Sequence, residues 1–225
     1  MLRTIIFDLD GVLIDSEPLM RLAFEASYRN VLGEGIPPTE DYLEHMGESF
    51  PNIMNHLGLP HALWQPYREF CQKHLDRIAL FPQTLDLLDW ACARGFNLAL
   101  LTGKDRLRTL QILDHFGLHS FFQVVVTSDQ LLYPKPHPEG IMCVLNSLNS
   151  QPEDAVMIGD AVNDIVAAQK ANVTAIAVTW GIKPDRVLSL CQPDFVAHDW
   201  KSLFRVLTEL STNTVGQEER IGIKD

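Results

Sequence analysis

Five short apolar runs separated by amphipathic stretches organise most of this chain. The runs cover residues 4–7, 96–101, 123–127, 155–158 and 174–178. Their length and bounding polar residues are typical of buried strands. Between them lie helical patterns such as 105–116, which Asp105 can cap and Gly117 can end. Strands that alternate with helices predict an α/β fold, with a parallel sheet in a Rossmann-like, three-layer α/β/α core.

The interval 16–79 breaks this alternation. Its amphipathic patterns predict helices at 18–32, 39–46, 50–57 and 62–78, with Gly and Pro residues between the first two. Roughly 65 residues are too many for a loop between consecutive strands, and we interpret 16–79 as an inserted helical cap.

The remaining boundaries follow from this insert. The α/β core then comprises 1–15 and 80–210. The polar segment 211–225 loses its periodicity, which predicts a flexible tail.

Composition excludes several classes of partner. The chain has 225 residues, 46% of them hydrophobic, enough to bury the core of one domain with an insert. A net charge of -11 without a basic cluster argues against nucleic acid. No apolar run approaches the roughly 20 residues of a membrane span, and no secretory signal opens the sequence. We therefore expect a cytoplasmic protein without membrane contact, either a monomer or a homodimer.

Cysteines and histidines suggest no further chemistry. Four scattered cysteines without a Cys-x-x-Cys motif favour reduced thiols in packed positions. His115 and His119 are separated by a helix-ending glycine, while Cys71 and His74 lack other ligands at metal spacing. We expect no zinc site.

The first apolar run ends on two carboxylates, Asp8 and Asp10, followed by Gly11. Side chains two apart on a strand share a face, and glycine permits a tight turn. Like charges this close need a cation or a proton between them. Oxygen ligands of this kind suit Mg²⁺.

Two later segments offer groups for a phosphate. The run 96–101 ends in Thr102, Gly103 and Lys104, a hydroxyl and a glycine-flanked N–H before a helix, which suits phosphate oxygens. The spacing is not that of a nucleotide P-loop. Lys135 lies between two prolines, where its ammonium could neutralise a phosphoryl group. An ordinary solvated lysine is the alternative.

The run 155–158 leads through Gly159 to two more carboxylates, Asp160 and Asp164. If a helix starts at Asp160, the two share a face and Asp160 also caps the helix. A cap alone would explain Asp160, but the carboxylates at the neighbouring strand end favour metal binding.

Together these motifs resemble the haloacid dehalogenase-like superfamily of phosphotransferases. The match consists of Asp8-x-Asp10-Gly-Val, then Thr102, Lys135 and Gly159-Asp160-x-x-Asn-Asp164, in that order. The insert resembles the small cap of phosphoglycolate phosphatases and β-phosphoglucomutases. The short segments 47–51, 102–104 and 159–161 also look like those of phosphatases associated with aminohydroxybenzoate synthesis.

The resemblance implies a role for each matched residue. Asp8 would be the nucleophile that becomes an aspartyl-phosphate, and Asp10 would donate a proton to the leaving alcohol. Mg²⁺ would bind the carboxylates of Asp8 and Asp160 and the backbone carbonyl of Asp10, with Asp164 a ligand or a support.

The phosphoryl oxygens would be held by Thr102, Gly103 and Lys135. Dehalogenation is disfavoured, because a halide leaves without the proton that Asp10 supplies.

The cap should select the substrate. The turn with Gly47, Glu48 and Ser49 is a candidate specificity loop, although an ordinary helix–helix turn would look the same. The leading hypothesis is a Mg²⁺-dependent phosphatase for a small phosphorylated metabolite of the sugar phosphate or phosphoglycolate type. A β-phosphoglucomutase-like mutase and a catalytically silent binding or regulatory protein are the alternatives.

Overall fold

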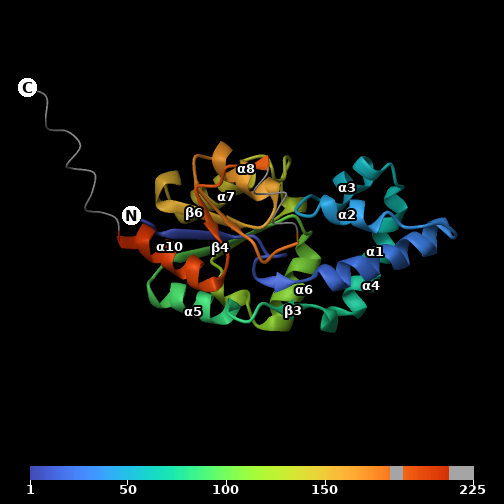
Figure 1. Cartoon of the computed structure of the whole chain (residues 1–225), viewed down its shortest axis with the longest axis horizontal. Coiled ribbons are helices and arrows are strands. Elements are labelled where there is room, and N and C mark those ends of the chain that lie inside the picture. Colours follow the sequence, from blue (N-terminus) through green and yellow to red (C-terminus); the bar gives the residue numbers. More distant parts are fainter. Residues whose placement is uncertain (183–189, 213–225) are drawn as a thin grey trace, which may run out of the picture.

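A parallel β-sheet forms the centre of the molecule. The computed structural model describes residues 1–182 and 190–212, and within them the sheet has six strands in the order β5-β4-β1-β6-β7-β8, flanked by helices on both faces (Figure 1). The strands are β1 (Thr4–Phe7), β4 (Asn97–Thr102), β5 (Val124–Thr127), β6 (Ala155–Gly159), β7 (Thr174–Val178) and β8 (Phe195–Ala197). The predicted α/β fold is confirmed.

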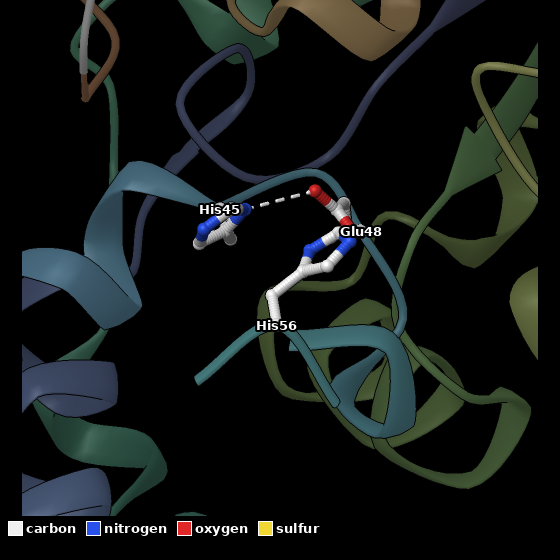
Figure 2. Close-up of side chains that lie close together, drawn as sticks. All are labelled: His45, Glu48 and His56. Carbon is white, nitrogen blue, oxygen red and sulfur yellow. Dashed lines mark hydrogen bonds and ion pairs between the residues drawn. The ribbon is translucent and has the colours of Figure 1, made fainter. Parts of the chain in front are cut away.

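The four α-helices of residues 17–73 lie beyond one end of this sheet (Figure 1). They are α1 (Glu17–Leu32), α2 (Thr39–Glu44), α3 (Phe50–Leu57) and α4 (Trp64–Lys73). The short antiparallel pair β2 (Ile14–Asp15) and β3 (Ala79–Leu80) connects them to the core. The end of α2, the following turn and α3 bring His45, Glu48 and His56 close together (Figure 2).

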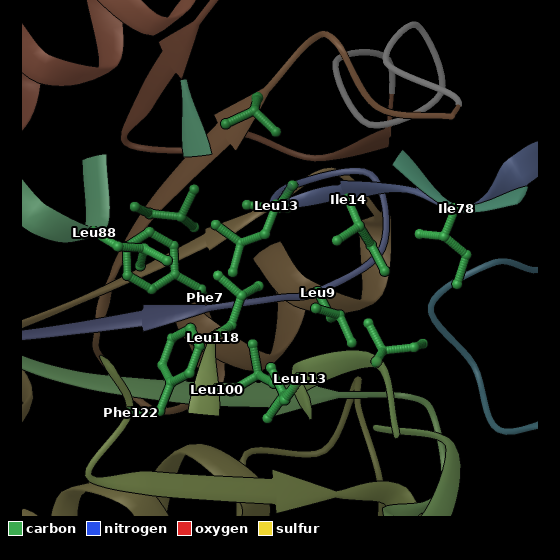
Figure 3. Packing of buried hydrophobic residues seen from close by; sticks show 14 of the residues in the cluster. Phe7, Leu9, Leu13, Ile14, Ile78, Leu88, Leu100, Leu113, Leu118 and Phe122 are labelled. Atoms are coloured by element: carbon green, nitrogen blue, oxygen red, sulfur yellow. The ribbon is translucent and has the colours of Figure 1, made fainter. Parts of the chain in front are cut away.

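Strand alternation divides the core into two layers. Ile5 and Phe7 pack with the cluster beneath α5 (Thr84–Ala93), α6 (Arg106–Phe116) and α10 (Trp200–Thr212), part of which Figure 3 shows. Ile6 packs on the other face, against α7 (Glu139–Leu148) and α8 (Val162–Lys170). Burying one such side chain fully contributes roughly 1.5–3 kcal/mol. The two faces explain why the strands read as continuous apolar runs.

The sheet brings three strand ends to one edge. In the register of the sheet Phe7 lies beside Leu100 of β4 and Ile158 of β6. Consequently the residues that follow β1, β4 and β6 emerge side by side. Parallel sheets bind ligands at this edge.

Several local predictions need correction. β8 and the β2–β3 pair were missed, because two or three half-buried residues carry too little periodicity. The helix predicted at 62–78 is α4, flanked by 3-10 turns and ended by the non-helical backbone of His74. Of the tail predicted at 211–225, Ser211 and Thr212 end α10, and 213–225 lie outside the described residues.

Short 3-10 helices and four free cysteines complete the fold. Short 3-10 helices lie at His61–Leu63, Leu75–Arg77, His119–Phe121, Ser128–Gln130 and Pro152–Asp154. The four cysteines are free, but Cys92 and Cys143 are exposed and not packed as predicted. In the described part of the chain, no helix combines the length and apolar character needed to cross a membrane.

Candidate active site

Asp8 lies directly after β1 and is almost completely buried, with 2% of its surface exposed. Its backbone N–H donates to the Ile158 carbonyl at 2.9 Å, which anchors it to β6. The Lys135 ammonium donates to the Asp8 carboxylate at 2.7 Å, to Asp164 at 2.5 Å and to the Leu101 carbonyl at 3.0 Å. Lys135 is therefore a buried cation between two carboxylates, and not the solvated loop residue that the sequence left open.

Asp160 and Asp164 follow β6 as predicted, but their local structure differs from the prediction. The helix α8 begins at Val162 with Ala161 as its cap residue, so Asp160 is not the helix cap. Its carboxylate accepts from the Ile182 N–H at 3.0 Å, and Asp164 accepts from the Ala161 N–H at 3.1 Å. Both carboxylates face inward because these backbone donors hold them.

Three carboxylates converge at this edge of the sheet. One oxygen each from Asp8, Asp160 and Asp164 lies within 4.8 Å of the others, and all three residues are buried. Burial and the neighbouring Asp8 and Asp164 charges raise the pKa of Asp160 well above its ordinary value. Burial likewise raises the pKa of Asp8 to about 7, with Lys135 opposing the rise. One lysine does not balance three buried acids, and a hard divalent cation with oxygen ligands fits the surplus charge.

The backbone packs closely around Asp160. A Cβ atom at Gly11 or at Gly181 would collide with the Asp160 carboxylate. Gly11 also has a φ of +73°, in the left-handed region that favours glycine. Because only glycine fits at these positions, the turn after β1 can approach the carboxylate cluster.

Asp10 has different partners from Asp8. β1 ends at Phe7, so both acids lie in the following turn and not on the strand. The Lys104 ammonium and the Ser16 hydroxyl donate to the Asp10 carboxylate. Burial alone would raise the pKa of Asp10, but Lys104 and the hydrogen bonds from Lys104 and Ser16 outweigh it and lower the pKa. The two acids of the opening motif thus have opposite pKa shifts.

The segment after β4 contributes backbone and an unpredicted cation. Thr102 ends the strand, and its buried hydroxyl accepts from the Lys104 N–H at 3.2 Å. A Cβ at Gly103 would lie only 2.7 Å from the Gly47 carbonyl oxygen, so this turn touches the turn between α2 and α3. No role for the Lys104 side chain was predicted from the sequence. Its position just after the end of β4, close to the polar Thr102, could have indicated that it belongs to the site.

A small cavity of about 30 Å³ lies above the two acids of the opening motif. Asp8, Asp10 and Lys104 line it from the core, and Gly47 and Glu48 line it from the turn after α2. Ser49 instead lines a neighbouring cavity of about 390 Å³ between α4 and α6. The predicted specificity turn therefore faces both spaces, and two of its three residues face the acids.

Aromatic residues and an arginine complete the walls of the small cavity. Tyr42 and Tyr67 line it, and the Tyr42 hydroxyl donates to the Tyr67 hydroxyl at 2.8 Å. Arg108 also lines it, paired with Asp105 at 2.5 Å and stacked over the Trp64 ring at 4.7 Å. The sequence carried no signal for these residues, because helical periodicity does not distinguish the wall of a cavity from a core.

Comparison with known proteins agrees with this arrangement. The model of the haloacid dehalogenase-like hydrolase family matches residues 5–178. Pyrophosphatase PpaX of Oceanobacillus iheyensis is 30% identical over 215 residues, which cover 92% of this chain and 97% of the relative. Pyrophosphatase PpaX of Bacillus pumilus is 34% identical over 212 residues, 92% of this chain and 96% of the relative.

A solved structure described as a predicted phosphoglycolate phosphatase from Haemophilus somnus has the same fold. It superposes with a TM-score of 0.82 at 20% identity and covers 92% of this chain and 98% of its own. The family match begins in β1 and ends with β7, and it includes all the acids and lysines described above. Gly181 and Ile182, which contact Asp160, lie just beyond it. The chain belongs to the haloacid dehalogenase-like hydrolase family, which confirms the prediction of an enzyme of this phosphatase family.

Proposed function

We propose that this protein is a Mg²⁺-dependent phosphatase that hydrolyses a small phosphorylated metabolite through an aspartyl-phosphate on Asp8. The observation that supports it most directly is the position of Asp8. Its carboxylate faces the small cavity, is held by Lys135 and lies beside Asp160 and Asp164. Phosphoryl transfer depends mainly on positioning and charge neutralisation, and these groups supply both.

The carboxylates of Asp8 and Asp160 and the backbone carbonyl of Asp10 would hold Mg²⁺, with Asp164 as a ligand or a support. The surplus of buried negative charge over the single Lys135 ammonium supports this assignment. When bound, Mg²⁺ neutralises charge on the phosphoryl oxygens.

Lys135 and the turn after β4 would position the phosphoryl group. The Lys135 ammonium orients the Asp8 carboxylate for in-line attack on phosphorus and offers a positive charge to a phosphoryl oxygen. Thr102 and the backbone at Gly103 would bind the other oxygens at the start of α6. Attack by Asp8 breaks the bond to the leaving oxygen, and water then hydrolyses the aspartyl-phosphate, so one difficult displacement becomes two easier ones.

Asp10 would give a proton to the leaving oxygen and later take one from the attacking water. In the substrate-free arrangement Lys104 pairs with Asp10 and lowers its pKa. Asp10 can hold a proton only when this ammonium is drawn elsewhere, and an anionic substrate in the same cavity is a competing partner for Lys104. Substrate entry would thereby raise the pKa of Asp10 and prepare it as an acid.

We further propose that residues 16–79 act as a cap that closes over the acids and limits substrate size. The contact of Gly47 with Gly103 and the small volume of the cavity support this role. Closure would exclude bulk water from the phosphoryl group. Inorganic pyrophosphate is the first substrate to test, because the relatives that align with 92% of this chain are named pyrophosphatases. Lys104 and Arg108 also line the cavity, and their positive charges could bind a second phosphoryl group.

The decisive experiment measures phosphate release from inorganic pyrophosphate, phosphoglycolate and sugar phosphates, with Mg²⁺ and with chelator. We expect turnover of at least one of them with Mg²⁺ and none with chelator. Full activity without metal would overturn the metal assignment. Conversion of glucose 1-phosphate to glucose 6-phosphate with little phosphate released would identify a mutase, and no turnover of any compound would favour the silent protein.

A further inference from the structure

A second group of metal-binding side chains lies in the helical insert, apart from the carboxylates. The Nδ1 atom of His45 lies 3.1 Å from one oxygen of Glu48, and the Nδ1 atom of His56 lies 3.2 Å from the other. All three ligand atoms lie within 4.8 Å of one another, and Figure 2 shows both imidazoles directed at the carboxylate. Two imidazoles and one carboxylate thus surround a single point.

We propose that His45, Glu48 and His56 form a binding site for Zn²⁺ or a chemically similar transition-metal ion. Two histidine nitrogens with one carboxylate are a ligand set that Zn²⁺ uses, whereas Mg²⁺ prefers oxygen ligands alone. Zn²⁺ bonds to these atoms are about 2.0–2.2 Å long, so ligands of one tetrahedral ion lie about 3.3 Å apart. Each imidazole nitrogen lies at nearly this distance from its own oxygen of Glu48. Rotation of the side chains that brings both nitrogens to one carboxylate oxygen would complete three of the four ligand positions.

The three ligands are held by folded segments. His45 ends α2, and the Glu48 N–H donates to the His45 carbonyl at 3.2 Å within the turn. His56 lies in the last turn of α3, which the buried side chains of Phe50 and Ile53 fix in place. Because the backbone around each ligand is already ordered, binding would order only side chains.

Exposure leaves room for the ion and for a fourth ligand. The His56 side chain is 52% exposed, whereas Glu48 is only 14% exposed. An ion can therefore enter from the His56 side and keep water in the open coordination position. Since Glu48 also lines the cavity above Asp8 and Asp10, the ion would hold the turn that faces the reaction site.

The site is independent of the proposed phosphatase activity, and its test needs no activity measurement. ZnCl₂ is titrated calorimetrically into the full-length protein saturated with Mg²⁺, and zinc-edge X-ray absorption reports the ligands. We expect one Zn²⁺ per chain with imidazole in its coordination shell. His45→Gln and His56→Gln should each weaken binding at least about tenfold, because loss of even an outer partner of a metal ligand costs 10–100-fold.

Two variants control for other sites. His61→Gln removes an exposed histidine of the same region that is paired with Asn55, and it should leave the affinity for Zn²⁺ unchanged. Asp160→Asn alters the carboxylate cluster and should also leave this affinity unchanged. Absence of Zn²⁺ binding, equal affinity in His56→Gln, or loss of binding in Asp160→Asn would each overturn the assignment. His56 is largely exposed and His45 is substituted separately, so misfolding of one variant does not remove the test.

Discussion

The edge of the sheet and the helical insert face the same small cavity with different chemistry. At the sheet edge, Asp8, Asp160, Asp164 and Lys135 form a buried network of ionisable groups. The insert contributes mostly uncharged side chains to the same cavity, including the rings of the hydrogen-bonded pair Tyr42 and Tyr67. The charged groups follow strand ends whose register is fixed, whereas the rings depend on how helices pack. This difference indicates that the core supplies reactivity and the insert supplies shape.

The largest expected effect separates the nucleophile from the rest of the charged network. Asp8→Asn keeps the shape of the side chain, and Lys135 retains Asp164 and the Leu101 carbonyl as partners. We expect a folded protein without measurable phosphate release, because the amide cannot attack phosphorus. Circular dichroism and thermal unfolding check the fold. A wild-type rate in this variant would exclude Asp8 as the nucleophile.

The second prediction concerns the acid that faces Lys104. Asp10→Asn should lower the rate by about 10²–10⁴-fold, the usual worth of a general acid–base group. The loss should shrink for an aryl phosphate with an acidic phenol, because that leaving group needs no proton. The two substrates are compared at saturating Mg²⁺. An equal loss with both would contradict proton donation by Asp10.

The third prediction compares a buried ion pair with an exposed one. Lys135→Met leaves Asp8 and Asp164 buried without their cation, which should lower the free energy of unfolding by about 3–5 kcal/mol in chelator. Mg²⁺ should recover part of this loss, since it supplies positive charge to the same carboxylates.

Arg21→Met is the matched control for this substitution. Arg21 pairs with Glu17 and Glu40 on the insert, but its side chain is 35% exposed, and an exposed pair contributes only about 0–1 kcal/mol. Urea unfolding measures both variants. Equal destabilisation of the two would contradict the contrast between buried and exposed charge.

The smallest effect tests the packing of the insert. Tyr42→Phe keeps the ring stacked on Phe24 but removes the hydrogen bond to Tyr67, which should cost about 1 kcal/mol of unfolding free energy. Tyr133→Phe, at a residue that is 56% exposed, should change stability by less than about 0.5 kcal/mol. Urea unfolding midpoints measure the stability of the two variants. Equal midpoints would mean that the hydrogen bond between Tyr42 and Tyr67 contributes nothing to stability.

Local sequence patterns predicted the structure correctly where an element depends only on residues that are close together in the chain. The apolar runs identified β1, β4, β5, β6 and β7, because a strand buried on both faces needs continuous apolar side chains. The ends of these runs also located Asp8, Thr102 and Asp160, since parallel strands end at one edge. Local pattern failed at β8, which has three residues, and at the start of α8, where Ala161 and not Asp160 is the cap.

The sequence by itself thus determined the five longer strands of the sheet, the helices between them, the family motifs and the acids placed at the strand ends. All of these are properties of residues near one another in the chain. Only the tertiary structure decided which distant groups meet. It paired Lys104 with Asp10 and Lys135 with Asp164, and it joined His45 and Glu48 to His56. These contacts depend on sheet order and on the packing of helices against the core, which no periodicity in the sequence encodes.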